Sequence, residues 1–113
     1  MNDWNQLIPH PLSTARASHG RSLALVADDD EWTYERLSQA VLRRAAGLIA
    51  DGVVPGERVA WTVNRCGGDV VSLHALGWIG ACAVPVPADD PDPKRYADQL
   101  GAERFVEWFN DGS

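Results

Sequence analysis

The residues best placed to do chemistry stand at positions 66 to 72, where the chain reads Cys-Gly-Gly-Asp-Val-Val-Ser. Two glycines ahead of a helix can bring backbone N–H groups close to a bound anion. The G-x-G-x-x-G spacing of a dinucleotide-binding loop is absent, and no Gly-rich loop ends in Lys. Gly67 and Gly68 are therefore predicted to make a close turn, with anion binding as the alternative.

The same segment superficially resembles the Gly-Gly-Asp-Ser-Leu motif of phosphopantetheine carrier proteins. In a carrier the attachment serine directly follows the Asp, so that a flexible arm projects from the start of a helix. Here Val70 follows Asp69, and Ser72 comes two residues later. A downstream strand that contains two prolines also disagrees with a small helical bundle, so we reject the carrier interpretation.

The other residue types capable of catalysis or metal binding are scattered. The serines lie in no nucleophile-elbow pattern, and the histidines have no ligand spacing with a Cys or carboxylate. The residues considered are Ser13, Ser18, Ser38, Ser72, His10, His19 and His74. Cys66 and Cys82 form no CxxC pair and are predicted to be reduced, largely buried thiols, with a single disulfide as the alternative. We therefore predict no catalytic residue, no cofactor-binding residue and no metal ligand in this chain.

Composition and charge limit the classes of function. The chain has 113 residues, 45% of them hydrophobic and 23% charged, which is typical of one globular domain. The net charge of −6 includes acidic clusters at positions 28–30 and 89–92 and disfavours binding to nucleic-acid phosphates. No basic segment followed by an apolar stretch is evident near the N-terminus, so the expected location is cytoplasmic.

One run of 19 residues, Val70 to Ala88, contains no Asp, Glu, Lys or Arg. A membrane span needs about 20 apolar residues, but Gly77, Gly80 and two prolines divide this run. We therefore predict no membrane span. The run is better interpreted as a buried helix, apolar on all sides, that leads into a buried strand.

The first half of the chain predicts a hairpin followed by a helix. Residues 12–19 are expected to form a short helix, residues 22–27 and 31–33 two paired strands, and the Asp triplet between the strands a turn. Thr33 is expected to cap the long helix that ends at Gly52. Its apolar face is Leu37, Val41, Ala45 and Leu48, whereas Gln39, Arg43 and Arg44 fall elsewhere.

The second half alternates strands and helices. Strands are expected at 58–63, 82–86 and 104–108, with Pro85 indicating a sheet edge, a bulge or an end of pairing. Asp69 is expected to cap one helix, and Asp92 with Pro93 to start another that ends near Gly101. This order predicts an α/β fold with a mostly parallel open sheet and flanking helices. Trp61 and Trp78 are expected in the core, and Trp4 and Trp108 are candidates for exposure.

Three segments in order resemble the start of the adenylate-forming enzymes, which include acyl-CoA synthetases, nonribosomal peptide adenylation domains and luciferases. Residues 52–60, Gly-Val-Val-Pro-Gly-Glu-Arg-Val-Ala, are similar to the family's Gly-Val-x-Pro-Gly-Asp-Arg-Val-Ala. Residues 75–86 are similar to Ala-Leu-x-x-x-Gly-Ala-x-x-x-Pro-Leu, and Asn64 stands where a strand of the family commonly ends. Residues 33–37 resemble Thr-Tyr-X-Glu-Leu, except that Arg36 replaces the Glu.

The resemblance covers roughly residues 22–100 and implies a structural part of a larger enzyme. Complete members activate a carboxylic acid with ATP and Mg²⁺ and transfer the acyl group to coenzyme A or a carrier thiol. Their phosphate loop and catalytic lysine come later in the sequence and have no counterpart here. The chain alone is therefore expected to bind no cofactor and to be inactive.

Two functions remain open from the sequence. The chain is either the N-terminal fragment or split subunit of such a ligase, or a non-catalytic interaction or regulatory module that retains the scaffold. The expected partner is the remainder of a split synthetase or a second copy of the chain. The expected organisation is an arm with a short helix (1–21), a partial α/β domain (22–108) and a tail (109–113).

Overall fold

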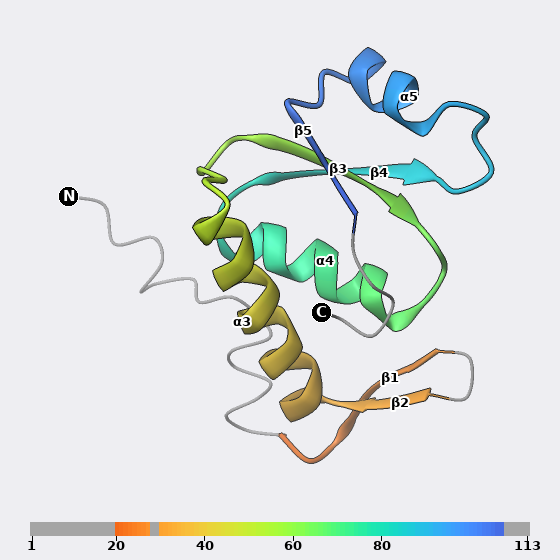
Figure 1. The fold of residues 1–113 in the computed structure, drawn as a ribbon. Helices are drawn as coiled ribbons and strands as arrows, with labels where there is room; N and C mark the ends of the chain where they lie inside the picture. Colours follow the sequence, from red (N-terminus) through yellow and green to blue (C-terminus); the bar gives the residue numbers. More distant parts are fainter. Residues whose placement is uncertain (1–19, 28–29, 108–113) are drawn as a thin grey trace.

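A computed structural model describes residues 20–27 and 30–107 of the chain. Its elements follow the order β1–β2–α3–β3–α4–β4–α5–β5 (Figure 1). The predicted helix at 12–19, Trp4, Trp108 and the tail at 109–113 lie outside the described residues, as does most of the predicted arm.

The first two strands form the predicted hairpin. Strand β1 (Leu23–Ala27) pairs antiparallel with β2 (Asp30–Thr33), and the register is irregular between Leu23 and Leu25. Asp30 belongs to β2 rather than to the turn, because it pairs with Ala27. The hairpin is a two-stranded sheet separate from the other strands.

Helix α3 (Tyr34–Ala50) begins where the sequence indicates. The side chain of Thr33 accepts a hydrogen bond from the backbone N–H of Arg36 and so caps the first turn. The helix is followed by Gly52 with φ +90°, a left-handed conformation that glycine adopts without steric cost. Both predicted ends of this helix are confirmed.

The three remaining strands form a parallel sheet in the order β4–β3–β5. They are β3 (Arg58–Val63), β4 (Cys82–Pro87) and β5 (Arg104–Val106). Strand β4 lies at an edge of the described sheet, which is one of the three alternatives that Pro85 indicated, because a proline has no N–H to donate to a second neighbour. Strand β5 ends at Val106, earlier than the predicted end at Trp108.

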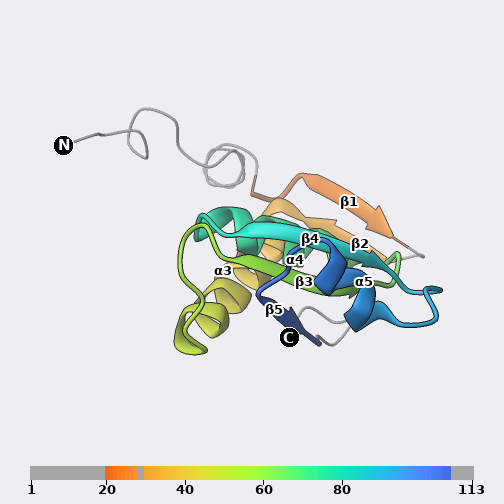
Figure 2. The ribbon, with the colours of Figure 1, turned by 90° about the horizontal axis from the view of Figure 1, so that it is seen from above.

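Helices cover the two faces of this sheet. Helices α3 and α4 (Gly67–Trp78) lie on one face, where Val59 and Trp61 point into the main core. The short helix α5 (Pro93–Gln99) covers the other face, where its Ala97 packs with Ala60 and Val86. Figures 1 and 2 show α4 and α5 on opposite sides of the strands. The predicted α/β fold with a parallel open sheet and flanking helices is thus confirmed.

Helix α4 is not buried on all sides, and this prediction is wrong. Its inward face carries Val71, Ser72, Ala75 and Leu76, but Leu73 is 51% exposed and Trp78 is 38% exposed. A single layer of helix against the sheet leaves the outward face of α4 uncovered by the described elements. Trp78 is therefore outside the core, whereas Trp61, 4% exposed, lies in it as predicted.

The charge-free run divides at Gly80, which has φ +77° and separates α4 from β4. Among the described residues, no helix is long and apolar enough to cross a membrane.

Candidate functional site

The candidate site lies at the carboxyl ends of β3 and β4. The chain leaves β3 towards α4 on one face of the sheet and leaves β4 towards α5 on the other (Figure 1). In open parallel sheets, ligands bind in crevices where neighbouring connections diverge in this way. The loop at residues 64–66, which joins β3 to α4, is therefore the part of the described chain best placed to contact a ligand.

Asp69 holds this loop in place. Its carboxylate accepts hydrogen bonds from the backbone N–H of Asn64 at 3.0 Å and of Cys66 at 3.0 Å, and from the Trp61 indole Nε1 at 3.2 Å. Asp69 is the third residue of α4, and Cys66 is the N-cap, so the prediction that Asp69 caps the helix is wrong by three positions. The helix begins earlier because the carboxylate reaches back to the cap residue, as in a capping box.

The Asp69 carboxylate also places a negative charge at the N-terminus of α4. The first turn of a helix attracts negative charge, and a free anion could bind there. In this structure Asp69 supplies that negative charge from within the chain. Gly67 and Gly68 are the first two residues of α4, so the predicted close turn before the helix is corrected, and the position where an external anion could bind is used by Asp69.

Trp32 explains why residue 67 is a glycine. A Cβ atom at Gly67 would lie 2.6 Å from Nε1 of Trp32, closer than such atoms approach. The indole of Trp32 is only 2% exposed and belongs to the main core. The hairpin therefore packs directly on the first turn of α4, a contact that sequence reasoning missed.

Arg44 is the second feature that the sequence did not reveal. Its side chain is 5% exposed and donates hydrogen bonds to the Gly68 carbonyl and to the Ser72 hydroxyl. The prediction that Arg44 lies away from the apolar face of α3 is wrong. The spacing of Arg44 from Leu37, Val41 and Leu48 places Arg44 on the same face of the helix. This spacing alone could have predicted its position.

Arg65 stands in an unusual conformation within the loop. Its φ is +57°, and it is the one non-glycine residue with a positive φ in the described part of the chain.

Two hollows flank the loop. One, of about 210 Å³, lies between β3, β5 and α4, and the other, of about 590 Å³, lies between the ends of β3 and β4 and Tyr96 of α5.

The described fold does not bring together the residues that were considered for catalysis or metal binding. Ser72 is 1% exposed and donates to the Gly68 carbonyl, so it offers no attachment point for a flexible arm. His74 lies on α4, and partial burial lowers its pKa below the ordinary value. No three His, Cys, Asp or Glu side chains gather as metal ligands in residues 20–27 and 30–107.

Both cysteines are free thiols, and they lie at opposite ends of the sheet. Cys82 pairs with Arg58 at the start of β3, whereas Cys66 follows the end of β3. The length of β3 separates these ends by about 16 Å, and a disulfide needs Cα atoms within about 7 Å. The alternative of a disulfide is therefore excluded in this fold. The expectation of buried thiols is wrong, because Cys82 lies exposed on the edge strand and Cys66 is half-buried.

Comparison with known proteins identifies the class. The family of AMP-binding enzymes matches residues 12–105. A nonribosomal peptide synthetase, opaA of Aspergillus ustus, is 35% identical over 77 residues, which are 68% of this chain and 2% of that protein.

Two solved structures are similar in fold. The N-terminal subdomain of NpsA from Klebsiella oxytoca, in complex with 3-hydroxybenzoyl-AMSN, has a TM-score of 0.80 and 24% identity over 88% of this chain and 26% of that one. Unliganded O-succinylbenzoate coenzyme A synthetase (MenE) from Bacillus subtilis has a TM-score of 0.76 and 24% identity over 88% and 22% of the two chains.

The chain belongs to the family of AMP-binding enzymes. It corresponds to the N-terminal region of these proteins and spans only a small part of each: 2% of opaA and about a quarter of the two solved chains.

Proposed function

We propose that this chain forms the first part of the N-terminal subdomain of an adenylate-forming ligase and acts there as scaffold. The observation that carries the proposal is the match to NpsA, which covers 88% of this chain and 26% of the NpsA subdomain. The use of Asp69 and Arg44 also supports it. Both charged groups contact the backbone of the chain itself, as expected of residues that build a framework.

In the proposed enzyme the chemistry resides in other residues. The complete ligase would activate a carboxylic acid as an acyl-adenylate with ATP and Mg²⁺ and then form a thioester with coenzyme A or a carrier thiol. The phosphate loop and catalytic lysine of the family have no counterpart among these 113 residues. The partner of this chain is then the polypeptide that carries them.

The test is ATP–pyrophosphate exchange, which reports reversible formation of an acyl-adenylate. The purified chain is assayed with a panel of aliphatic and aromatic carboxylic acids, alone and after co-expression with the polypeptide encoded directly downstream. We expect no exchange by the chain alone, and both co-purification and exchange when the partner is present. The partner expressed without this chain is the control and should be inactive.

Two outcomes would contradict the proposal. Exchange by the rigorously purified chain alone would show that it needs no other part. A downstream polypeptide without a phosphate loop and catalytic lysine, together with no exchange in the mixture, would favour a non-catalytic interaction module.

A further inference from the structure

The hairpin is attached to the rest of the molecule by backbone hydrogen bonds at its base and by side chains, among them Trp32, Ala24 and Leu25, that pack in or against the main core. It shares no strand pairing with the three-stranded sheet. At its base, the backbone N–H of Tyr34 donates to the Ser22 carbonyl at 3.0 Å, and that of Glu35 donates to the Gly20 carbonyl at 2.8 Å. Because a two-stranded hairpin alone is marginally stable in water, its position depends on this core packing together with the contacts that hold its far end.

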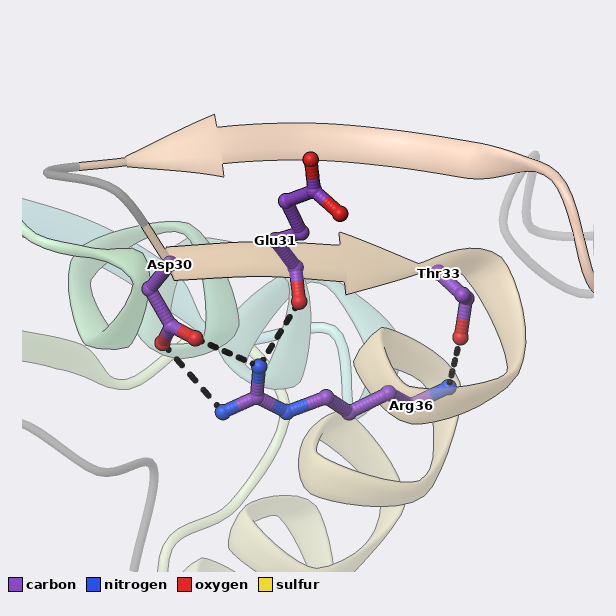
Figure 3. Close-up of polar contacts among 4 residues, drawn as sticks. All are labelled: Asp30, Glu31, Thr33 and Arg36. Atoms are coloured by element: carbon purple, nitrogen blue, oxygen red, sulfur yellow. Dashed lines mark hydrogen bonds and ion pairs between the residues drawn. The ribbon is translucent and has the colours of Figure 1, made fainter.

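Arg36 makes those contacts at the far end of β2. Its Nη1 lies 2.9 Å from Oδ1 of Asp30 and 2.8 Å from the Glu31 carbonyl, and its Nη2 lies 3.3 Å from Oδ2 of Asp30 (Figure 3). The guanidinium also lies 3.8 Å from the centre of the Trp32 ring. We call these four contacts the Arg36 clamp.

Trp32 connects the clamp to the candidate site. Arg36 covers the face of its indole, while an edge of the indole lies against Gly67. Gly67 directly follows the loop at residues 64–66, which Asp69 fixes through the N–H groups of Asn64 and Cys66. Any outward movement of β2 that withdraws Trp32 therefore removes the packing on the first turn of α4.

We propose that the hairpin is a hinged flap closed by the Arg36 clamp, and that its closure fixes the 64–66 loop and the first turn of α4 at the carboxyl edge of the sheet through the contact of Trp32 with Gly67. The hinge is the backbone junction at residues 20–22 and 34–35. In the open state the indole leaves Gly67, and the amides of the loop and of the first turn of α4 become accessible to solvent.

Hydrogen exchange measured by mass spectrometry tests this proposal in the full chain. Asp30→Asn removes the charge that Arg36 contacts. We expect exchange to rise about fivefold in residues 22–27 and 30–33 and in residues 64–69, with no change in residues 58–63 and 82–87. Glu31→Gln is the matched control, because Figure 3 shows the Glu31 carboxylate pointing away from Arg36 while only the Glu31 backbone carbonyl takes part. It should leave exchange unchanged.

Three results would overturn the proposal. An equal rise in residues 58–63 would show that the whole fold opens, not the hairpin. A rise in the hairpin without one in residues 64–69 would show that the loop does not depend on it, and an equal effect of Glu31→Gln would show that the clamp is not the cause.

A second measurement needs no variant and covers the case in which Asp30→Asn does not fold. In the wild-type chain, high salt screens the half-exposed pair of Arg36 and Asp30. Exchange in residues 22–27, 30–33 and 64–69 should then rise together between low and high salt. No change in either segment would also overturn the proposal.

Discussion

At the scale of single residues, the contact of Trp32 with Gly67 joins the hairpin to α4. The indole takes the space that any larger side chain at position 67 would need, since a Cβ atom there would lie 2.6 Å from Nε1. The neighbouring ring atoms Cε2 and Cζ2 would be at 2.7 and 2.9 Å, so a rotation within the plane of the ring does not relieve the overlap. Either the indole or the helix must move.

We expect Gly67→Ala to lower the free energy of unfolding by about 1–3 kcal/mol, the usual cost of overpacking a core. Urea denaturation measures the change. We expect Trp32→Leu to destabilise the chain as well, because Trp32 is a core residue, but this change removes the ring atoms that overlap with the new methyl group. The double variant should therefore lose less stability than the sum of the two single variants. Strict additivity would contradict the proposed overlap.

The buried charge of Arg44 gives a second prediction at this scale. Arg44→Met keeps the length of the side chain and removes its hydrogen bonds to the Gly68 carbonyl and the Ser72 hydroxyl. We expect a loss of about 1.5–3 kcal/mol in the free energy of unfolding, the range for bonds made by a charged group. Arg43→Met, at the exposed neighbouring position, is the control and should have little effect. Equal effects of the two variants would contradict the structural role of Arg44.

At the scale of elements, the connection between α4 and β4 requires a left-handed backbone conformation at Gly80 more than it requires the small size of glycine. Gly80 has φ +77°, and a Cβ atom there would meet Pro55 at 3.5 Å, an ordinary contact. The left-handed conformation is the reason for glycine at this position.

Gly80→Val should lower thermal stability, with a cost of about 1–2 kcal/mol for a left-handed residue and more for a β-branched one. Gly80→Asn should cost less, because Asn tolerates this conformation. Gly77→Ala is the matched control, at a position near the end of α4 where the space is open and alanine favours the helix. If Val and Asn destabilise equally in calorimetry, steric contact rather than φ is the cause.

The ion pair of Arg104 with Glu57 ties β5 to the turn that precedes β3. Arg104 Nε lies 2.6 Å from Oε2 of Glu57, and Arg104 also donates to the Asp51 carbonyl. The guanidinium beside Glu57 lowers the pKa of that carboxyl below its ordinary value of 4.5. The pair therefore stabilises the fold fully above pH 4.5, and this contribution disappears as the pH falls through the lowered pKa.

Glu57→Gln tests this pH dependence. The wild type should be more stable than the variant at pH 7, and the difference in free energy of unfolding should shrink as the pH falls below 4.5. Urea denaturation at a series of pH values measures it. Glu31→Gln, at a side chain outside any ion pair recorded in the structure, is the control. A difference that is independent of pH would show that Glu57 acts through packing.

At the scale of the whole molecule, the described chain presents large apolar side chains to solvent. Leu23 and Val26 of β1 and Leu73 of α4 are each more than half exposed. The three-stranded sheet also has two open edges among the described residues, and prolines protect only β4. These features are those of a unit that other protein surfaces cover, in agreement with the proposed role as part of a larger subdomain.

We therefore expect the isolated chain to associate. Light scattering should show species larger than a monomer, and a hydrophobic dye should bind. Co-expression with the proposed partner polypeptide should reduce both signals, because the partner covers the same surfaces. A monodisperse monomer that binds no dye would contradict this prediction.

Local features of the fold followed from the sequence because their causes are local. The cap at Thr33, the left-handed glycine at position 52, the edge position of Pro85 and the alternation of strands and helices each depend on residues close in the chain. The motifs at 52–60 and 75–86 identified the family because their causes are also local. Each motif contains a turn or a helix-to-strand connection whose backbone conformation requires particular residues.

Contacts between distant segments were decided only by the tertiary structure. Arg44 and Ser72 are 28 residues apart, and Trp32 and Gly67 are 35 apart, so no local pattern places them together. Exposure of Trp78 and Cys82 likewise depends on which layers cover α4 and β4. The sequence thus determined the elements and the family, whereas packing across the chain determined which charged and aromatic side chains hold the loop at the carboxyl edge of the sheet.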